Sequence, residues 1–267
     1  MRHMESYGEV WYEDIGRDYF NQEYWYLLVS VMVRYWRGEL MNVGDACACM
    51  KTGSVRTREA RLRRLLDASW IKKSKSAPDK RQTCVLPTRD MQRIVGAHLR
   101  RSLIEAARFA HKSDLLDAVE PLIGALETNG DTLNQTHLLP WAEFLIEYTD
   151  HWNATFDNRF HTEEYWHPFV HCLLAFWAAR PLTIGEACQT MRTGSNRTRE
   201  SRIAIAMMRD LLVKRKTDTD LRTLLVLPAP ELERCLVAHF DRTLKQLGRL
   251  LGDLLMRGLA DGPAETS

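Results

Sequence analysis

The sequence predicts a mainly α-helical protein with small β-hairpins, an α+β fold in which one structural unit occurs twice in tandem. Three observations lead to this prediction. Residues 24–103 align without a gap with residues 165–244, and about a third of the paired residues are identical. Apolar residues recur at helical spacing over most of each copy. Each copy also holds one segment with strand signals on both sides of a charged tip.

The clearest trace of the repeat is a short arginine-rich string. TGSVRTRE occupies residues 52–59 and TGSNRTRE occupies residues 193–200, so seven of eight residues recur 141 positions later. The one difference pairs Val55 with Asn196. Chance does not produce such a match, which indicates a tandem duplication.

The first half of each copy predicts three helices. In the first copy, aromatic and aliphatic residues at helical spacing predict a helix over 24–37, and a short helix with small residues follows at 42–50. Residues 51–53 form a glycine-containing turn, and Ser54 is a good N-cap for a basic helix over 55–69. A short helix, a tight turn and a longer basic helix are the sequence outline of a helix-turn-helix.

The second half of each copy predicts a hairpin and a long helix. Residues 70–71 and 83–86 have strand character, and a tip with proline and charged residues separates them. The second copy preserves the length of this hairpin. A helix-turn-helix followed at once by a basic hairpin is a winged helix. The apolar stripe of the long helix that follows exceeds the needs of a small core, which predicts that these helices pack on one another.

Charge is distributed unevenly along the chain, although the formal net charge is only +2. Residues 51–81 carry a balance of +8, residues 192–222 carry +5 and residues 112–165 carry −9. Each basic island begins at or next to the repeated string and suits a polyanionic partner. The acidic stretch predicts a helix over 114–126, a loop and a second helix over 138–156. We therefore divide the chain into a first winged-helix segment at 1–110, a helical acidic connector at 111–150 and a second winged-helix segment with a long C-terminal helix at 151–267.

The composition argues against several classes of protein. No apolar run reaches the roughly 20 residues needed to cross a bilayer, and the N-terminus lacks the pattern of a signal peptide. We therefore expect a soluble, cytoplasmic protein with no membrane partner. The six cysteines lie among apolar residues without paired metal spacing and are expected to be reduced. No nucleophile–base pair, glycine-rich phosphate loop or metal triad is visible, so we expect neither an enzyme nor a bound cofactor.

These motifs together resemble the MarR family of winged-helix transcription regulators. The similarity covers about 80 residues of each copy and rests on a second helix that begins Ser-x-x-Thr-Arg, a hairpin with Asp-x-Arg near its tip and a long helix after it. Ordinary members are homodimers of one unit. The resemblance therefore implies tandem winged helix-turn-helix domains joined by a helical, dimerisation-like core, which is a single-chain pseudo-dimer.

The basic helices are the predicted recognition helices. Arginine can bond bidentately to guanine in the major groove, while hydroxyl groups and a helix N-terminus suit phosphate. The candidate residues are Ser54, Arg56, Thr57, Arg58, Arg61 and Arg64 in the first copy, and Ser195, Arg197, Thr198, Arg199 and Arg202 in the second. A solvated helix face with internal Glu–Arg pairs is the alternative. The second copy has Ala204 and Ile205 where the first has Arg63 and Arg64, which predicts a weaker hold on phosphate.

The hairpins are the predicted wings. The family resemblance assigns Arg81 and Arg222 to the minor groove, with Asp79 and Asp220 orienting them; an ion pair internal to the hairpin is the alternative. Narrow minor grooves favour an inserted arginine without base-specific bonds. Sequence-independent phosphate attraction is expected from Lys72, Lys73, Lys75, Lys80, Lys214, Arg215 and Lys216.

The family resemblance also implies a small-molecule pocket near the connector. Aromatic side chains there could stack on an aromatic effector, and the candidates are Trp25, Trp141, Trp152 and Trp166. Plain interface packing is the alternative with more support.

Three further groups of residues can be explained by a structural role. His167 and His171 have metal-ligand spacing but no third ligand, so we expect no metal. Cys47 and Cys188 match across the repeat and are either redox sensors or small residues in a helix contact. The matched histidines, His98 and His239, are expected to make helix-face hydrogen bonds.

The function expected from this sequence is a sequence-specific DNA-binding transcription regulator, most simply a repressor. Its partners would be double-stranded DNA, read as a pseudo-palindromic operator by two recognition helices and two wings, and a small aromatic effector. The chain would act as a monomeric pseudo-dimer or as a homodimer. Two alternatives stay open: a replication initiator of the plasmid type, which also joins two winged helices, and a winged-helix scaffold for protein interactions.

Overall fold

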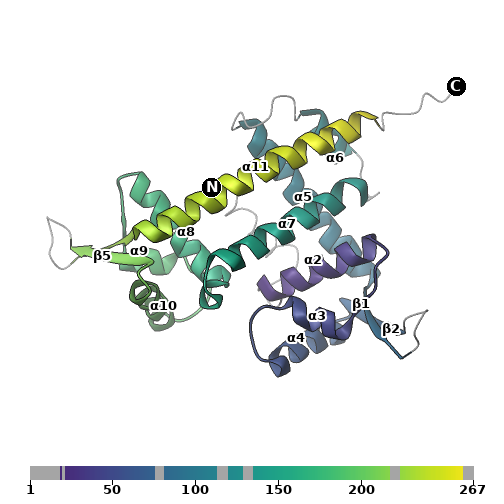
Figure 1. Cartoon of the computed structure of the whole chain (residues 1–267), viewed down its shortest axis with the longest axis horizontal. Coiled ribbons are helices and arrows are strands. Elements are labelled where there is room, and N and C mark those ends of the chain that lie inside the picture. The colour runs from purple at the N-terminus through teal and green to yellow at the C-terminus, as the bar shows by residue number, and fades with distance from the viewer. Residues whose placement is uncertain are drawn as a thin grey trace. The chain divides into compact units, whose positions relative to one another are not determined.

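The computed structural model describes residues 19, 22–75, 81–112, 120–128, 135–216 and 223–260. These residues are mainly helical and carry two small antiparallel sheets, which confirms the α+β class (Figure 1). The chain separates into two compact units, residues 1–150 with 244–267 and residues 151–243. Helices α7 (Gln135–Thr155) and α11 (Pro230–Ala260) each contribute residues to both units.

The first unit contains the first sequence repeat. Its sheet has the strand order β1-β3-β2, with both pairings antiparallel. The elements in chain order are α2 (Gln22–Trp36), β1 (Met41–Asn42), α3 (Val43–Cys49), α4 (Val55–Asp67), β2 (Ile71–Lys75), β3 (Thr83–Pro87), α5 (Arg89–Lys112), α6 (Glu120–Thr128) and the beginning of α7. The two-residue strand β1 was not predicted, because a single pair of residues carries no periodic signal.

The second unit repeats this order. Its sheet has the strand order β4-β6-β5, again antiparallel throughout. The elements are η2 (Asn158–Phe160), α8 (Glu163–Trp177), β4 (Leu182–Thr183), α9 (Ile184–Gln189), α10 (Asn196–Met208), β5 (Leu212–Lys216), β6 (Leu224–Pro228) and the first part of α11.

The strand register is the same in the two sheets. Met41 faces Val85 in the first sheet and Leu182 faces Val226 in the second, and both members of this pair are shifted by the spacing of the sequence repeat. Helices α4 and α10 begin and end at equally shifted positions. The gapless alignment therefore holds for the folded elements as well as for the sequence.

The core of the first unit lies between α2 and α5. Helix α2 is buried over most of its circumference, and Leu27 and Leu28 are both 0% exposed. The predicted apolar stripe of α5 consists of Met91, Ile94, Val95, Leu99 and Leu103; Ile94 is partly buried and the other four are fully buried. Helices α2 and α5 therefore form the base on which α3, α4 and the hairpin are held.

The acidic helix α7 is tied to α2 by polar contacts within the first unit. Glu143 Oε1 accepts a hydrogen bond at 2.9 Å from Nε of Arg37, the residue after α2, and Nη2 of the same arginine lies 2.8 Å away. Asp150 accepts a hydrogen bond from the Tyr26 hydroxyl at 2.9 Å. Lys51, the first residue of the turn before α4, lies 3.5 Å from the same Asp150 carboxylate. Burial and the neighbouring Asp150 raise the pKa of Tyr26, because both disfavour the phenolate. Acidic residues of the connector thus form ion pairs with basic residues of the first repeat.

No helix among the described residues has both the length and the apolar character that a bilayer span requires.

Candidate nucleic-acid interface

Helix α4 begins with the cap that the sequence predicts. Ser54 has extended backbone angles, and its Oγ accepts a hydrogen bond from the Thr57 amide at 3.2 Å. The hydroxyl groups of Ser54 and Thr57 lie 3.0 Å apart. Helix α10 repeats the arrangement, because Ser195 Oγ accepts from the Thr198 amide at 3.3 Å and the two hydroxyls are again 3.0 Å apart. The serine hydroxyls expected to meet phosphate therefore also cap their helices.

The glycine of each turn is favoured by conformation and by space. Gly53 has φ +91° and Gly194 has φ +95°, in the left-handed region that other residues rarely adopt. A Cβ at Gly53 would lie 3.0 Å from Cγ2 of Thr57, and one at Gly194 would lie 3.2 Å from Nη1 of Arg202. A side chain at this position would therefore be strained by the positive φ and would crowd the following helix.

Arg61 is directed back toward the turn. Its Nη1 donates to the Thr52 carbonyl at 2.8 Å and lies 3.8 Å from Oε2 of Glu23 on helix α2. Oε1 of the same buried Glu23 accepts from the Thr52 amide at 3.1 Å. Arg61 was predicted as a DNA contact, but this geometry favours a role in holding the turn.

The second unit contains the same brace, meaning the contacts that join the acidic residue, the arginine and the turn, and its ion pair is shorter. Nη1 of Arg202 lies 2.8 Å from Oε2 of Glu164 and 2.9 Å from the Thr193 carbonyl oxygen. Glu164 Oε1 accepts from the amide and the hydroxyl of Thr193, at 3.1 and 2.7 Å. Sequence reasoning missed Glu23 and Glu164, although they match at the repeat spacing one residue before the aligned stretch.

Two more of the predicted arginines are only half exposed. Nη1 of Arg58 lies 3.5 Å from the Met50 carbonyl oxygen, and Arg199 approaches the carbonyl oxygens of Thr193 and Arg192 at 3.5 Å. Arg64 is exposed, and its guanidinium lies over the Tyr19 ring at 5.6 Å. Arg56 and Arg197 are exposed at the second position of their helices. We call the first five residues of each helix, 55–59 and 196–200, its leading edge. Arg56 and Arg197 are the side chains of the leading edge that are best placed for an external partner.

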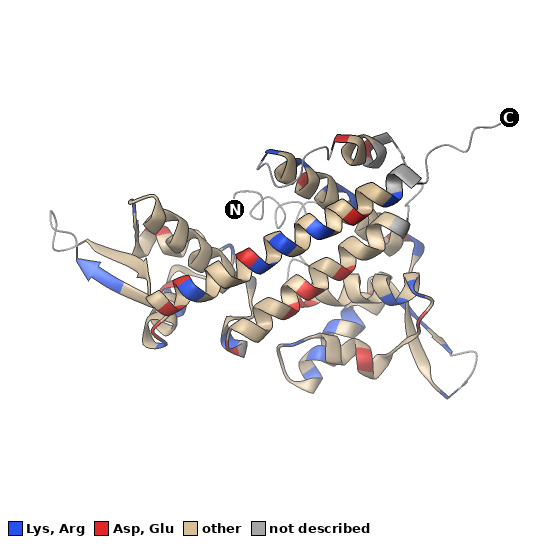
Figure 2. Ribbon diagram, turned by 45° about the horizontal axis from the view of Figure 1, so that its top comes forward, with Lys and Arg blue, Asp and Glu red and all other residues tan. Residues whose placement is uncertain are grey.

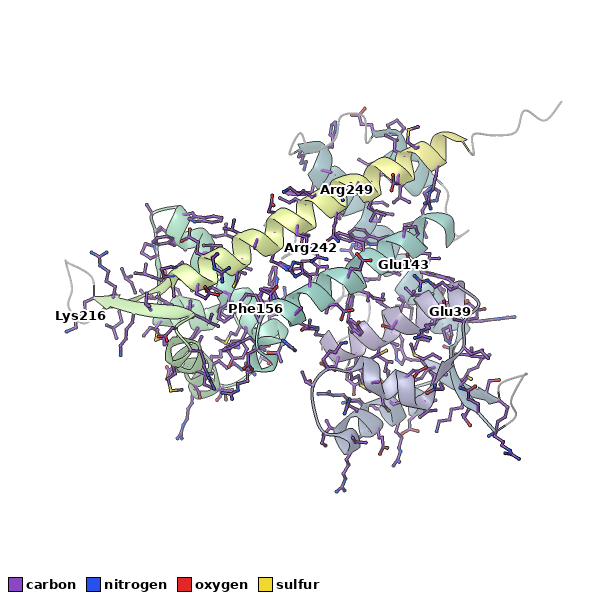
Figure 3. All side chains as sticks on the ribbon, viewed as in Figure 1. Glu39, Glu143, Phe156, Lys216, Arg242 and Arg249 are labelled. Carbon is purple, nitrogen blue, oxygen red and sulfur yellow. The ribbon has the colours of Figure 1, made fainter. Side chains whose placement is uncertain are left out.

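The first strand of each hairpin is an edge strand of its sheet and adds basic side chains to the surface. Lys72, Lys73 and Lys75 of β2 are exposed, as are Lys214, Arg215 and Lys216 of β5. Figure 2 shows the basic residues of α4 and β5, and Figure 3 shows Lys216 at the end of β5. Arg81 is also exposed. The other predicted wing residues, Asp79, Lys80, Asp220 and Arg222, lie outside the residues that the structure describes.

The four tryptophans of the predicted effector pocket lie two in each unit. Trp25 and Trp141 belong to the first unit, and Trp152 and Trp166 belong to the second. Trp141 is buried and its Nε1 donates to Ser102 Oγ at 2.8 Å. Trp152 is also buried and donates to the Phe160 carbonyl at 3.1 Å. Both indoles act as satisfied core side chains, and the effector pocket stays a prediction.

A different pocket, of about 440 Å³, opens between α5 and α6 in the first unit. Its lining is mostly charged, and Arg108 lies across it with donors 2.6 Å from Glu105 and 2.6 Å from Glu127. These hydrogen bonds raise the pKa of Arg108 further. The pocket therefore differs in chemistry from the aromatic site that the family resemblance implied.

The thiols of the two matched cysteines lose their proton less readily than a free cysteine does. Burial, and next the charge of Glu59 or Glu200, raises the pKa of Cys47 and of Cys188. Because oxidants react with the thiolate, the structure favours packing over redox sensing for this pair.

The matched histidines, His98 and His239, are fully buried. The His239 ring packs edge-on against Trp152 and His151, at centroid distances of 5.5 and 5.0 Å. Burial lowers the pKa of His239 to about 3, so its imidazole is neutral near pH 7. His167 and His171 lie 6.4 Å apart between ring centroids, and within the described part of the chain no three potential ligands form a metal cluster.

The two repeats thus present the same construction: a capped helix, a braced glycine turn, an exposed arginine at the second helical position and a basic strand beside it. Comparisons of this chain with models of protein families and with curated proteins find no match.

Proposed function

We propose that this chain is a sequence-specific DNA-binding transcription regulator with two MarR-like winged helix-turn-helix domains, most simply a repressor. The observation that carries the proposal is the duplicated leading edge. Arg56 and Arg197 are exposed at the same position of two identically capped helices. A helix that enters the major groove contacts bases with its N-terminal residues, and arginine is the commonest reader of guanine.

The surrounding charge supports the same function. The exposed basic residues of β2 and β5 would attract phosphates without regard to sequence. The braces on the two turns keep backbone amides and hydroxyls at the helix starts, where an anion is favoured. The same brace in both repeats gives the two helix starts the same geometry, as two half-sites of one operator require.

The test is binding to DNA selected from a random pool, measured by fluorescence anisotropy at several salt concentrations. The double variant Arg56→Ala with Arg197→Ala should lower affinity by at least about 30-fold, because each of the two guanine contacts is worth roughly 1–3 kcal/mol. The matched control is Arg93→Ala with Arg234→Ala. These arginines also correspond across the repeat, and both side chains are 72% exposed on α5 and α11. An unchanged affinity in the first variant would overturn the proposal.

The orientation of the selected half-sites separates two kinds of DNA-binding function. Inverted half-sites fit the regulator. Directly repeated sites, the pattern of iterons, would favour the replication initiator instead.

One observation favours a protein-interaction scaffold as a second candidate. Met208 and Val213 are 73% and 42% exposed, where the first repeat has Asp67 and Lys72. Exposed apolar side chains beside a recognition helix suit a protein partner. A second unit that acts as a scaffold would leave DNA affinity insensitive to Arg197→Ala and give no salt dependence from β5.

A further inference from the structure

The leading edges of α4 and α10 differ at one residue, which is the first of each helix. The N-cap before Val55 has φ −65° and ψ 164°, and the N-cap before Asn196 has φ −65° and ψ 162°. The caps accept from the third residue of each helix at nearly equal distances. The two side chains therefore leave their helices from equivalent backbone positions.

Both side chains face solvent. Val55 is 61% exposed, and Asn196 is exposed as well. Neither residue is needed to fill the core, and both stand directly before the exposed arginine of the leading edge. Their difference is therefore one of surface chemistry, at the place where a recognition helix meets base edges.

We propose that this pair gives the two half-sites of the operator different sequences, with a thymine read by Val55 and an adenine read by Asn196 at the equivalent position. An apolar side chain packs on the C5-methyl group that only thymine presents in the major groove. An asparagine amide accepts from adenine N6 and donates to adenine N7. The inference rests on the proposed function and adds the identity of one base in each half-site.

A consequence is that the chain binds its operator in one direction. A symmetric homodimer reads both half-sites alike and cannot distinguish the two orientations of a site. With Val55 in one unit and Asn196 in the other, reversing the chain would place the valine on adenine and the asparagine on thymine. Each mismatch would weaken binding on the order of tenfold.

Selection from random DNA with the full-length chain tests the inference. The wild type should select two half-sites that differ at one equivalent base pair. Val55→Asn should change only the thymine half-site, to adenine, and Asn196→Val should change only the adenine half-site, to thymine. Bases contacted by Arg56 and Arg197 should stay the same in all three proteins, which provides an internal control.

The outcomes separate this inference from the function on which it rests. Failure to select any DNA sequence would reject the proposed function. Selection of half-sites that are identical at this base pair, or that ignore both substitutions, would reject the inference and leave the function standing.

Base analogues test the same contacts without altering the protein. Uracil in place of the thymine removes only the methyl group and should lower wild-type affinity several-fold. 7-Deazaadenine in place of the adenine removes only N7 and should lower it on the order of tenfold. The uracil effect should vanish in Val55→Asn and the deazaadenine effect in Asn196→Val. Equal affinities of the wild type for natural and modified sites would overturn the inference.

Discussion

Glu164 joins helix α8 to Arg202 of helix α10, with Oε2 and Nη1 2.8 Å apart. The same carboxylate accepts hydrogen bonds from Thr193 in the turn between α9 and α10. Only 24% of the Arg202 side chain and 12% of the Glu164 side chain are exposed, so solvent screens this pair less than a surface ion pair. The conformation of the turn therefore depends on an acidic residue from another helix.

Replacement of Glu164 by glutamine should destabilise the second unit. The change removes the charge but keeps the size, and it leaves Arg202 and the Thr193 amide with a weaker acceptor. We expect a loss of about 1–2 kcal/mol in the free energy of unfolding, measured in urea. Glu231→Gln is the control, because it breaks an ion pair with Arg234 on the exposed face of α11. Equal stabilities of the two variants would refute a role for the brace.

Alanine at Gly53 should impair both folding and DNA binding. It combines a positive φ with a Cβ only 3.0 Å from the Thr57 side chain. Gly38→Ala is the matched control, since Gly38 also has a positive φ, of +72°, but nothing lies within 4 Å of its Cβ. The strain alone costs about 1 kcal/mol, and we expect Gly53→Ala to cost clearly more in thermal or urea unfolding. Equal losses would show that crowding at the turn is unimportant.

The number of exposed arginines on the recognition helices should set the salt dependence of DNA binding. Arg63 is exposed on α4, and its counterpart on α10 is Ala204. Each phosphate contact changes the slope of log affinity against log salt by about 0.9. Arg63→Ala should therefore flatten the slope by about one unit, and Ala204→Arg should steepen it by about one. Anisotropy titrations from low to high salt measure both, and slopes that match the wild type would contradict the assignment of this face to phosphate.

Acid should destabilise the second unit through His239. The folded protein holds this histidine neutral, with a pKa of about 3, while the unfolded chain takes up the proton near the ordinary value of 6.5. The unfolded state thus binds more protons below pH 6.5. The free energy of unfolding therefore decreases by about 1.4 kcal/mol for each unit that the pH is lowered below 6.5, or by about 2 kcal/mol between pH 7 and pH 5. His239→Gln should remove this part of the pH dependence. Urea unfolding at pH 7 and pH 5 gives the comparison, and an undiminished loss in the variant would rule out His239 as its source.

Much of the local structure follows from residue types alone. Ser54 before a basic helical stretch predicted the cap that the structure has, and the strand residues on both sides of the charged tip predicted the hairpin. The constant spacing of the repeat then predicted each element of the second copy from its counterpart in the first. Helix α10 and strand β5 begin at the expected residues. These signals are local, so a single sequence contains them.

The direction of long side chains could not be predicted in the same way. Arg56 and Arg61 look equivalent in sequence, but Arg61 lies five residues further along α4, on a different face of the helix. Its side chain turns back to Glu23. The partner belongs to a helix that is remote in sequence, so only tertiary packing shows which arginine is used internally. The strands β1 and β4 were missed for a similar reason, since each is defined by its pairing with a distant strand.

The equal spacing of corresponding elements makes the two repeats interchangeable parts. Residues 51–75 and 192–216 can be exchanged without the insertion or deletion of a single residue, because α4, β2, α10 and β5 begin and end at matching positions. One chimera would carry two copies of the first segment and another two copies of the second. Each would be a symmetrised version of the same chain, and its difference from the natural protein would measure what divergence after the duplication has added.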